Sequence, residues 1–389
     1  MNSTDFIVHA IENMEADRLM LETVKFDIEC LTPMFTGGVD RYCDRLHETG
    51  IIGSMRWWYE LIIRGLGFYA CDPTSKDYQC KFDPNSKKPF DEQLCPVCRM
   101  FGTTGWRRQF NLQIKWEPND KSYFWLKSID RNNQWWLNKI FEFPKKGNVV
   151  DNKFAIVIRN TNNEIIQQLK YLLSIMQTCG GIGAKNQYGF GIFECNDSVS
   201  PDDSLKGIYD YLRNGKCVRH SNEKDSGWNN LEKLWWYDLA INDNNSMVKQ
   251  WQNSRYYINR SKDQSAKFLL PTAFDIRYKI PPVNSPDDPI LGLRASCKNR
   301  HGRNITRKYF GYVDGDHRQR SNIFVSHLYR RAEMTDYHVK AWGFSGSSHG
   351  IEVGEELKRI FEIKTPIIMN SFSLNRSEGY KVIRSEVNE

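Results

Sequence analysis

Residues 163–195 read NEIIQQLKYLLSIMQTCGGIGAKNQYGFGIFEC, and no other segment constrains the architecture as strongly. Its length and apolar spacing predict a helix over 163–178 that stops at Gly180 and Gly181, followed by a strand over 190–195. Glycine tolerates positive φ and lets the backbone approach another chain, and successive N–H groups in such a loop can hold a phosphate. The glycine loop (residues 180–191) is therefore either a phosphate-contacting segment or a turn that caps the helix.

The glycine loop does not match the common nucleotide-binding motifs. Its glycines follow a helix and precede a strand, unlike those of a dinucleotide-binding fingerprint, and no G-K-[ST] sequence occurs in it. Lys185 and the planar side chains of Asn186, Gln187 and Tyr188 lie between the glycines. Side chains of this kind favour contact with RNA over a purely structural turn.

Periodicity around the loop predicts the order β-α-β-β-α-β. Residues 23–31 alternate apolar and polar side chains, as a half-exposed strand does, and Ser54 is placed to cap a helix that runs to Arg64. The other expected elements are strands at 107–116, 122–128 (its hairpin partner), 154–158 and 190–195, and the helix at 163–178. This order is typical of ferredoxin-like folds, which RRM domains also use.

The second half of the chain has less regular patterns. They predict helices near 228–240, 247–257 and 353–362 and strands at 271–280, 322–329 and 337–342. We expect an α+β protein of two ferredoxin-like (RRM-like) domains with insertions. The domains are placed at 20–200 and 205–371, and a polar tail at 372–389.

Composition excludes several classes of protein. The 389 residues are 40% hydrophobic and include 12 Trp, 18 Tyr and 21 Phe, enough to build cores rather than a disordered chain. Apolar runs are too short to span a bilayer, and the N-terminus lacks the basic and then apolar pattern of a secretory signal. Ten cysteines without an export signal indicate a reducing cytoplasm, where clustered cysteines more often bind metal than form disulfides.

The net charge of +7 is concentrated in one place. The basic segment (residues 294–331) holds ten basic and two acidic side chains, so it carries +8 while the other residues sum to −1. Such a concentration predicts a polyanionic partner. Arg318 and Arg320 belong to this segment, and nearby aromatic side chains such as Tyr309 could stack on unpaired bases.

Four cysteines have the spacing of a metal site. Cys71, Cys80, Cys95 and Cys98 give C-x8-C-x14-C-x2-C, and the last pair has the spacing of a zinc knuckle. The segment 70–100 shows little periodicity and would gain order from a metal. We therefore predict a structural Zn²⁺ held by these four thiolates. The alternative is a set of free cysteines in which the last pair supports a turn.

Four short stretches resemble the RAMP superfamily of CRISPR effector proteins. They are Thr32-Pro33 through Thr36-Gly37-Gly38, Gly53-Ser54-Met55-Arg56-Trp57-Trp58, Cys95-Pro96-Val97-Cys98-Arg99-Met100-Phe101-Gly102, and the glycine loop. The Arg-Trp-Trp helix start is most similar to the first-numbered RAMP subunits of type III-B (Cmr) effector complexes. The resemblance covers most of residues 20–345 and is specific at these four motifs.

The resemblance implies an RNA-binding structural subunit of a type III-B CRISPR-Cas complex that acts in antiviral defence. Its partners would be guide RNA (crRNA), near the 3′ end, single-stranded target RNA and other RAMP/Cas subunits, with no membrane. The residues expected to contact RNA are Thr36, Gly37, Gly38, Ser54, Arg56, Trp57, Gly181, Gly183, Lys185, Asn186, Gln187, Tyr188, Gly189, Arg318 and Arg320. For Arg56 the alternative is a surface ladder of ion pairs with Glu60 and Arg64, at i, i+4 and i+8.

No catalytic residue is predicted. None of the eight histidines forms an H-E-x-x-H or H-x-E motif. One rival interpretation is a RAMP endoribonuclease that processes guide RNA or cuts target RNA, using His47, Asp40 or Asp44 in the loop after the first strand. Another is a zinc-stabilised assembly protein whose basic segment meets an acidic protein surface.

Overall fold

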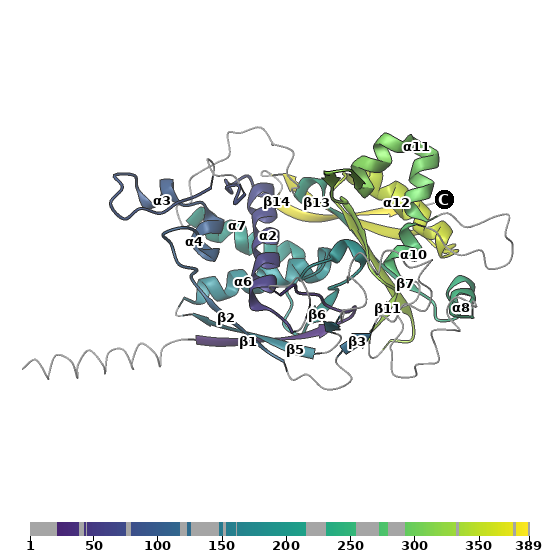
Figure 1. Ribbon diagram of the computed structural model, residues 1–389, viewed down its shortest axis with the longest axis horizontal. Helices are drawn as coiled ribbons and strands as arrows, with labels where there is room; N and C mark the ends of the chain where they lie inside the picture. The colour runs from purple at the N-terminus through teal and green to yellow at the C-terminus, as the bar shows by residue number, and fades with distance from the viewer. Residues whose placement is uncertain are drawn as a thin grey trace, which may run out of the picture.

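The computed structural model describes residues 22–38, 43, 45–74, 79–116, 123–125, 148–150, 153–160, 162–214, 231–253, 272–278, 292–331, 334–375 and 379–387 (Figure 1). Asp40 and Asp44 lie outside these residues. Among the described helices, none is long and apolar enough to cross a membrane.

Four antiparallel strands form the first sheet in the order β2-β5-β1-β6. Their bounds are β1 (Glu22–Cys30), β2 (Asn111–Lys115), β5 (Lys153–Asn160) and β6 (Phe193–Cys195). In β1 the buried Phe26 and Ile28 alternate with the exposed Lys25 and Asp27, as the sequence pattern requires. α2 (Glu48–Gly65) follows β1 and α6 (Asn163–Cys179) follows β5, which is the predicted β-α-β-β-α-β order with a small hairpin inserted.

Two details of this half differ from the expectation. α2 begins at Glu48, with His47 rather than Ser54 at its N-cap, because Ile51 is buried and extends the apolar face of the helix back past Gly53. β3 (Tyr123–Trp125) pairs with β4 (Asn148–Val150) and not with β2. The partner of β2 is β5, which pairs with β1 on one edge and with β2 on the other. Its mostly buried side chains agree with this position inside the sheet.

The second sheet has six strands, with the path β10-β12-β7-β13-β14 and β11 paired to β12. The strands are β7 (Trp235–Ile241), β10 (Ile323–Val325), β11 (Tyr329–Arg330), β12 (Tyr337–Gly343), β13 (Ile367–Asn375) and β14 (Gly379–Val387). The helices of this half are α8 (Ser246–Asn253), α10 (Ala273–Arg277), α11 (Leu293–Phe310) and α12 (Ser347–Ile360). The remaining elements are α3 (Phe90–Gln93), α4 (Pro96–Phe101), η1 (Asn186–Tyr188), α7 (Pro201–Asn214), η2 (Leu231–Lys233), β8 (Tyr312–Asp314) and β9 (His317–Gln319).

Three expectations for the second half are wrong. The helix expected near 228–240 is strand β7, because Tyr237, Leu239 and Ile241 are buried in alternation with exposed residues. The strand expected at 271–280 contains helix α10, which a capping box between Thr272 and Asp275 stabilises. The expected polar tail at 372–389 contains the end of β13 and β14, which pair along nine residues of each strand.

One buried apolar cluster crosses from the first half of the chain to the second. Trp236, Trp342 and Phe372 belong to the same cluster as the apolar residues of β1, α2 and α6. The ring centroids of Trp58 on α2 and Phe344 after β12 are 6.4 Å apart. Figure 1 shows α2 and α6 between the two sheets. Because the core is shared, the division into two domains stays a prediction.

A polar network joins the same two halves. Arg331 lies between two carboxylates: its Nε is 2.5 Å from Glu194 on β6, and its Nη2 is 2.6 Å from Asp238 on β7. Asp238 also accepts a hydrogen bond from the Tyr329 hydroxyl at 3.1 Å and lies 3.2 Å from His338 Nδ1. Burial raises the pKa of Asp238, but these donors and the nearby cations outweigh it and lower the pKa below its ordinary value.

Candidate functional site

The glycine loop packs against the segment that follows β1. Ala184 N donates to Phe35 O at 2.8 Å, and Gly191 N donates to Pro33 O at 2.9 Å. Five more N–H groups of the loop have protein acceptors, those of Gly180, Ile182, Gly183, Tyr188 and Gly189. These seven N–H groups are thus not free to form a phosphate nest, and the loop presents its side chains instead.

Close packing explains the glycines of the loop. Gly183, Gly189 and Gly191 have φ values of +83°, +93° and +83°, which side chains other than glycine rarely adopt. A Cβ atom on Gly189 would lie 2.5 Å from the Cβ of Ala273 on α10. The glycines therefore fold the loop and let it approach the second half of the protein.

Side chains from α2 and from the loop itself hold this shape. Ser54 Oγ accepts a hydrogen bond from Gly183 N at 3.1 Å, and Trp58 Nε1 donates to Gly181 O at 3.0 Å. Asn186 Nδ2 donates across the loop to the carbonyls of Ile182 and Phe190, at 3.2 and 2.8 Å. Ser54 lies inside α2 and not at its N-terminus, so the free N–H groups and the dipole of the helix end do not favour an anion beside it.

The predicted residues after β1 have different surroundings. Thr36 is fully buried, and its hydroxyl donates to Arg45 O and accepts from His47 N, both at 3.0 Å. Gly37 is exposed and Gly38 is half-buried. Lys185 Nζ lies 4.7 Å from the ring centroid of Phe35. Contact of these residues with RNA stays a prediction.

The tip of the glycine loop, η1, meets helix α10. Arg277 Nη1 donates to Gln187 O at 2.5 Å. The rings of Tyr188 and Phe274 are stacked, with centroids 5.5 Å apart and planes inclined by 14°. The loop therefore bridges the two halves at the point where the predicted RNA-contacting side chains lie.

The loop tip and the basic segment line one cleft of about 510 Å³, named here the central cleft. Gln187 and Tyr188 come from the glycine loop, while Arg318 and Arg320 come from β9 and the residue after it. Trp57 on α2 adjoins this cleft, because the Arg320 guanidinium lies 5.7 Å from its ring centroid. Five of the predicted RNA-contacting residues, from three distant segments, are thus neighbours in the fold.

Other residues of the central cleft were not predicted from the sequence. Arg277 and Tyr278 line it together with the predicted residues and with Arg294, the first residue of the basic segment. A second cleft of about 450 Å³ shares Arg294 and Tyr278 and continues along Lys298 and Arg303. The Thr272-x-x-Asp275 capping pattern was the available signal for α10, and it would have placed Arg277 at the end of a helix.

Ion pairs use part of the positive charge of the basic segment. Arg300 pairs with Glu355 and Glu356, Arg307 with Asp314, and Arg331 with Glu194 and Asp238. Arg318 and Arg320 are exposed, and within the described residues neither forms an ion pair with a carboxylate. Apart from the paired Arg307, five basic side chains of the segment line the two clefts: Arg294, Lys298, Arg303, Arg318 and Arg320.

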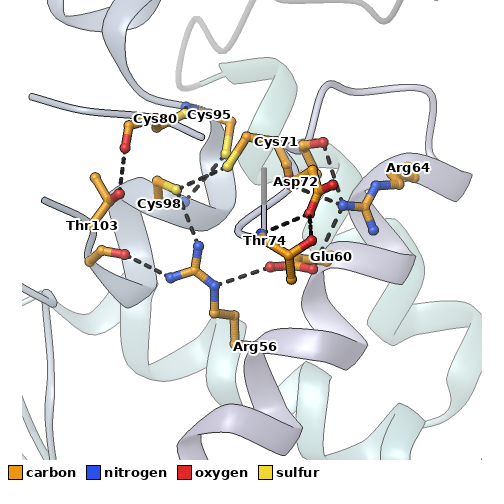
Figure 2. Close-up of polar contacts among 12 residues, drawn as sticks. Arg56, Glu60, Arg64, Cys71, Asp72, Thr74, Cys80, Cys95, Cys98 and Thr103 are labelled. Carbon is orange, nitrogen blue, oxygen red and sulfur yellow. Dashed lines mark hydrogen bonds and ion pairs between the residues drawn. The ribbon is translucent and has the colours of Figure 1, made fainter. Parts of the chain in front are cut away.

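The four predicted cysteines form one buried cluster, named here the cysteine cluster (Figure 2). Their sulfur atoms all lie within 4.8 Å of one another, and the Sγ atoms of Cys71 and Cys98 are 3.4 Å apart. A tetrahedral zinc–thiolate centre with Zn–S bonds of about 2.3 Å requires sulfurs about 3.8 Å apart. Hydrogen bonds among the four thiols lower the pKa of Cys80 and Cys95 and raise the pKa of Cys71 and Cys98. The donor set and its geometry fit a closed four-thiolate site.

The cysteine cluster is attached to α2 by the ion-pair ladder predicted as the alternative for Arg56 (Figure 2). Arg56 Nε lies 3.1 Å from Glu60, while its Nη1 donates to Gly102 O at 2.7 Å and its Nη2 to Cys98 Sγ at 3.3 Å. Arg64 pairs with the other oxygen of Glu60 at 3.6 Å and donates to Cys71 O at 3.0 Å. Glu60 is buried rather than on the surface. The role of Arg56 in RNA contact stays a prediction.

Residues 27–194 match the model of the RAMP superfamily. This part of the chain is therefore similar to the RAMP superfamily, as the four motifs indicated. It contains β1, α2, the cysteine cluster, α6 and the glycine loop. No curated protein matches the chain.

Three solved structures resemble the fold. The crystal structure of Cmr1 from Pyrococcus furiosus in its apo form is 14% identical, covers 83% of this chain and 88% of that chain, and gives a TM-score of 0.42. A chain of the type III-B Cmr-β complex bound to cognate target RNA and AMPPnP, in the presence of ssDNA, is 13% identical, with coverages of 87% and 97% and a TM-score of 0.35. Cmr6 from Pyrococcus furiosus is 15% identical, with coverages of 45% and 97% and a TM-score of 0.25.

Proposed function

We propose that this protein is an RNA-binding structural subunit of a type III-B CRISPR-Cas ribonucleoprotein complex. It would contact guide RNA, near its 3′ end, and single-stranded target RNA, alongside other RAMP/Cas subunits. The observation that carries the proposal is the central cleft, where Gln187 and Tyr188 of the glycine loop meet Arg318 and Arg320 of the basic segment. The RAMP superfamily match supports the class of complex.

The chemistry of the central cleft suits a single strand. Exposed guanidinium groups neutralise phosphates, and an aromatic ring beside them can stack on an unpaired base whatever its identity. Such contacts give affinity without sequence preference. Base pairing between guide and target would supply the sequence preference. For single-stranded RNA, the logarithm of the binding constant falls with the logarithm of the salt concentration with a slope of about −0.7 per phosphate contacted.

We propose that a structural Zn²⁺ occupies the cysteine cluster. When bound, the metal would cross-link the residue 71–98 segment, which has little apolar core of its own. Four thiolates around a divalent ion leave a net negative charge, and Arg56 and Arg64 on α2 lie within hydrogen-bond distance of the cluster or its backbone. The arginines would orient the thiolates and hold the segment against α2.

We propose that the subunit itself has no catalytic residue. In the rival endoribonuclease interpretation His47, which stands at the N-cap of α2, would act as a base. The test is incubation of purified protein with single-stranded RNA. Cleavage that is lost in His47→Ala while RNA binding persists would establish the endoribonuclease instead.

Binding of unrelated single-stranded RNAs between low and moderate salt tests the proposed function. We expect steep salt dependence and little sequence preference, and Arg320→Gln should weaken binding to every sequence. Binding that is absent, or that does not change with salt, contradicts the proposal. Capture of neighbouring acidic subunits without RNA binding would favour the assembly protein.

A further inference from the structure

Arg277 is a buried cation at the floor of the central cleft, with only 3% of its surface exposed. Its acceptors are neutral: Gln187 O at 2.5 Å, Ser321 Oγ at 3.1 Å and Phe310 O at 3.5 Å. Its Nε is buried and has no acceptor within the part of the chain that the structure describes. No carboxylate of that part forms an ion pair with it. A buried charge without a counter-ion is costly, and an anionic ligand beside it would offset that cost.

A second guanidinium adds to the same positive charge. Arg294 on α11 also lines the central cleft, and its Nη1 donates to the carbonyls of Phe310 and Gly311 at 3.2 and 3.1 Å. The guanidinium carbons of Arg277 and Arg294 lie 5.7 and 5.5 Å from the ring centroid of Tyr278. Burial lowers the pKa of Arg277, the nearby Tyr278 raises it and the charge of Arg294 lowers it again. Two like charges with only neutral acceptors would be stabilised by an anion between them.

Aromatic rings form the adjoining wall. Tyr188, Phe274 and Tyr278 stack in a row, with successive centroids 5.5 and 5.1 Å apart and planes inclined by 14° and 18°. The cleft volume of about 510 Å³ lies within the range of roughly 300–1,000 Å³ that sites for small molecules have. The neighbouring cleft continues the basic surface along Lys298 and Arg303, where further phosphates of a chain could lie. A flat ring beside a pair of guanidinium groups matches a base and its phosphate.

We propose that the central cleft binds one nucleotide of an RNA strand, with its phosphate at Arg277 and Arg294 and its base against Tyr188. This site rests on the proposed RNA-binding function and adds to it a defined position on the protein for one nucleotide. Diffuse attraction to positive charge would not distinguish the half-buried Arg294 from an exposed arginine elsewhere on the protein. A site of defined geometry does distinguish Arg294 from other arginines, because the fold fixes its guanidinium groups and its ring.

The test uses the full-length protein and a fluorescently labelled ten-residue oligouridine, with binding followed by anisotropy over a salt series. Arg294→Gln should weaken binding about tenfold and make the salt slope shallower by about 0.7, the share of one phosphate in single-stranded RNA. Tyr188→Ala should weaken it about tenfold through lost stacking, with the slope unchanged. Arg213→Gln removes one exposed arginine of α7, which lies outside both clefts, and should change affinity less than twofold.

Two outcomes separate the nucleotide site from the proposed function. Equal losses in Arg294→Gln and Arg213→Gln, with salt-dependent binding by the wild type intact, would overturn the site and leave RNA binding standing. Absence of salt-dependent binding by the wild type would overturn the function itself. Because Arg277→Gln alters the interior, we also propose cross-linking of 4-thiouridine RNA to the unmodified protein. Cross-links at Tyr188 or Tyr278 support the site, and cross-links confined to other segments contradict it.

Discussion

Replacing Asp238 by asparagine should loosen the junction between the two halves of the protein. The substitution keeps the shape of the side chain and removes its charge. In the wild type, Asp238 Oδ2 lies 2.6 Å from Arg331 Nη2, and Oδ1 accepts from Tyr329 at 3.1 Å. In the variant, Arg331 loses the carboxylate of Asp238 and keeps that of Glu194, at 2.5 Å. The expected result is a lower free energy of unfolding.

The magnitude follows from burial and from the partners that remain. Breaking a fully buried ion pair costs about 3–5 kcal/mol. The Asp238 side chain is 35% exposed, so solvent screens part of the interaction. Arg331 also keeps Glu194, and the asparagine carbonyl can still accept one hydrogen bond. We therefore expect a loss of about 2 kcal/mol near pH 7, at the lower end of values for hydrogen bonds to charged groups.

The loss should depend on pH in a defined direction. The pKa of Asp238 is lower in the folded protein than in the unfolded chain, so its contribution is complete above the unfolded pKa of about 3.9 and is lost as pH falls below it. Urea unfolding of wild type and Asp238→Asn at pH 7, 5 and 3.5 measures this difference. Asp316→Asn, at an exposed turn, is the control and should change stability by less than about 0.5 kcal/mol. A pH-independent difference, or equal effects of both substitutions, would refute the reasoning.

Three further outcomes are expected. Metal analysis should give one zinc per chain, and Cys98→Ser should lower both the zinc content and the melting temperature; a melting temperature unaffected by strong chelators would contradict this. Gly189→Ala should lower the free energy of unfolding by about 1–3 kcal/mol more than Gly315→Ala does. Both glycines have positive φ, but only a Cβ at Gly189 would meet α10, so equal losses would contradict the packing. Burial lowers the pKa of His327 to about 3, below the unfolded value of about 6.5, so stability should fall by about 1.4 kcal/mol per pH unit as pH drops between these values. His327→Gln should flatten that dependence in acid unfolding curves, and an unchanged slope would exclude His327 as its origin.

The first half of the fold was largely predictable because its patterns are local. Phe26 and Ile28 alternate with charged residues, and α6 has the length and period of a core helix. The four cysteines were predictable as a set, since the spacing of Cys95 and Cys98 is restrictive. The position of Ser54 was misjudged, because Gly53 interrupts a helical pattern that Ile51 had already begun.

The second half was less predictable because tertiary packing determines its elements. β7 reads WWYDLAI, and its large aromatic side chains fit either a helix or a strand until the neighbouring β12 and β13 are known. β14 reads GYKVIRSEV, which does not alternate apolar and polar residues, and its strand conformation depends on pairing with β13. The central cleft could not be predicted from the sequence, because Arg277 and Tyr188 are 89 positions apart and meet only in the folded protein.

The apolar cluster that crosses the two halves also has a consequence for the chain during its synthesis. Residues of β1, α2 and α6 leave the ribosome first, while Trp236, Trp342 and Phe372, which complete their core, are translated much later. Until then the nascent chain exposes the apolar face on which these side chains pack. A fragment that ends near residue 200 would lack these three side chains and expose the apolar face on which they pack, so we expect it to aggregate or to require a chaperone.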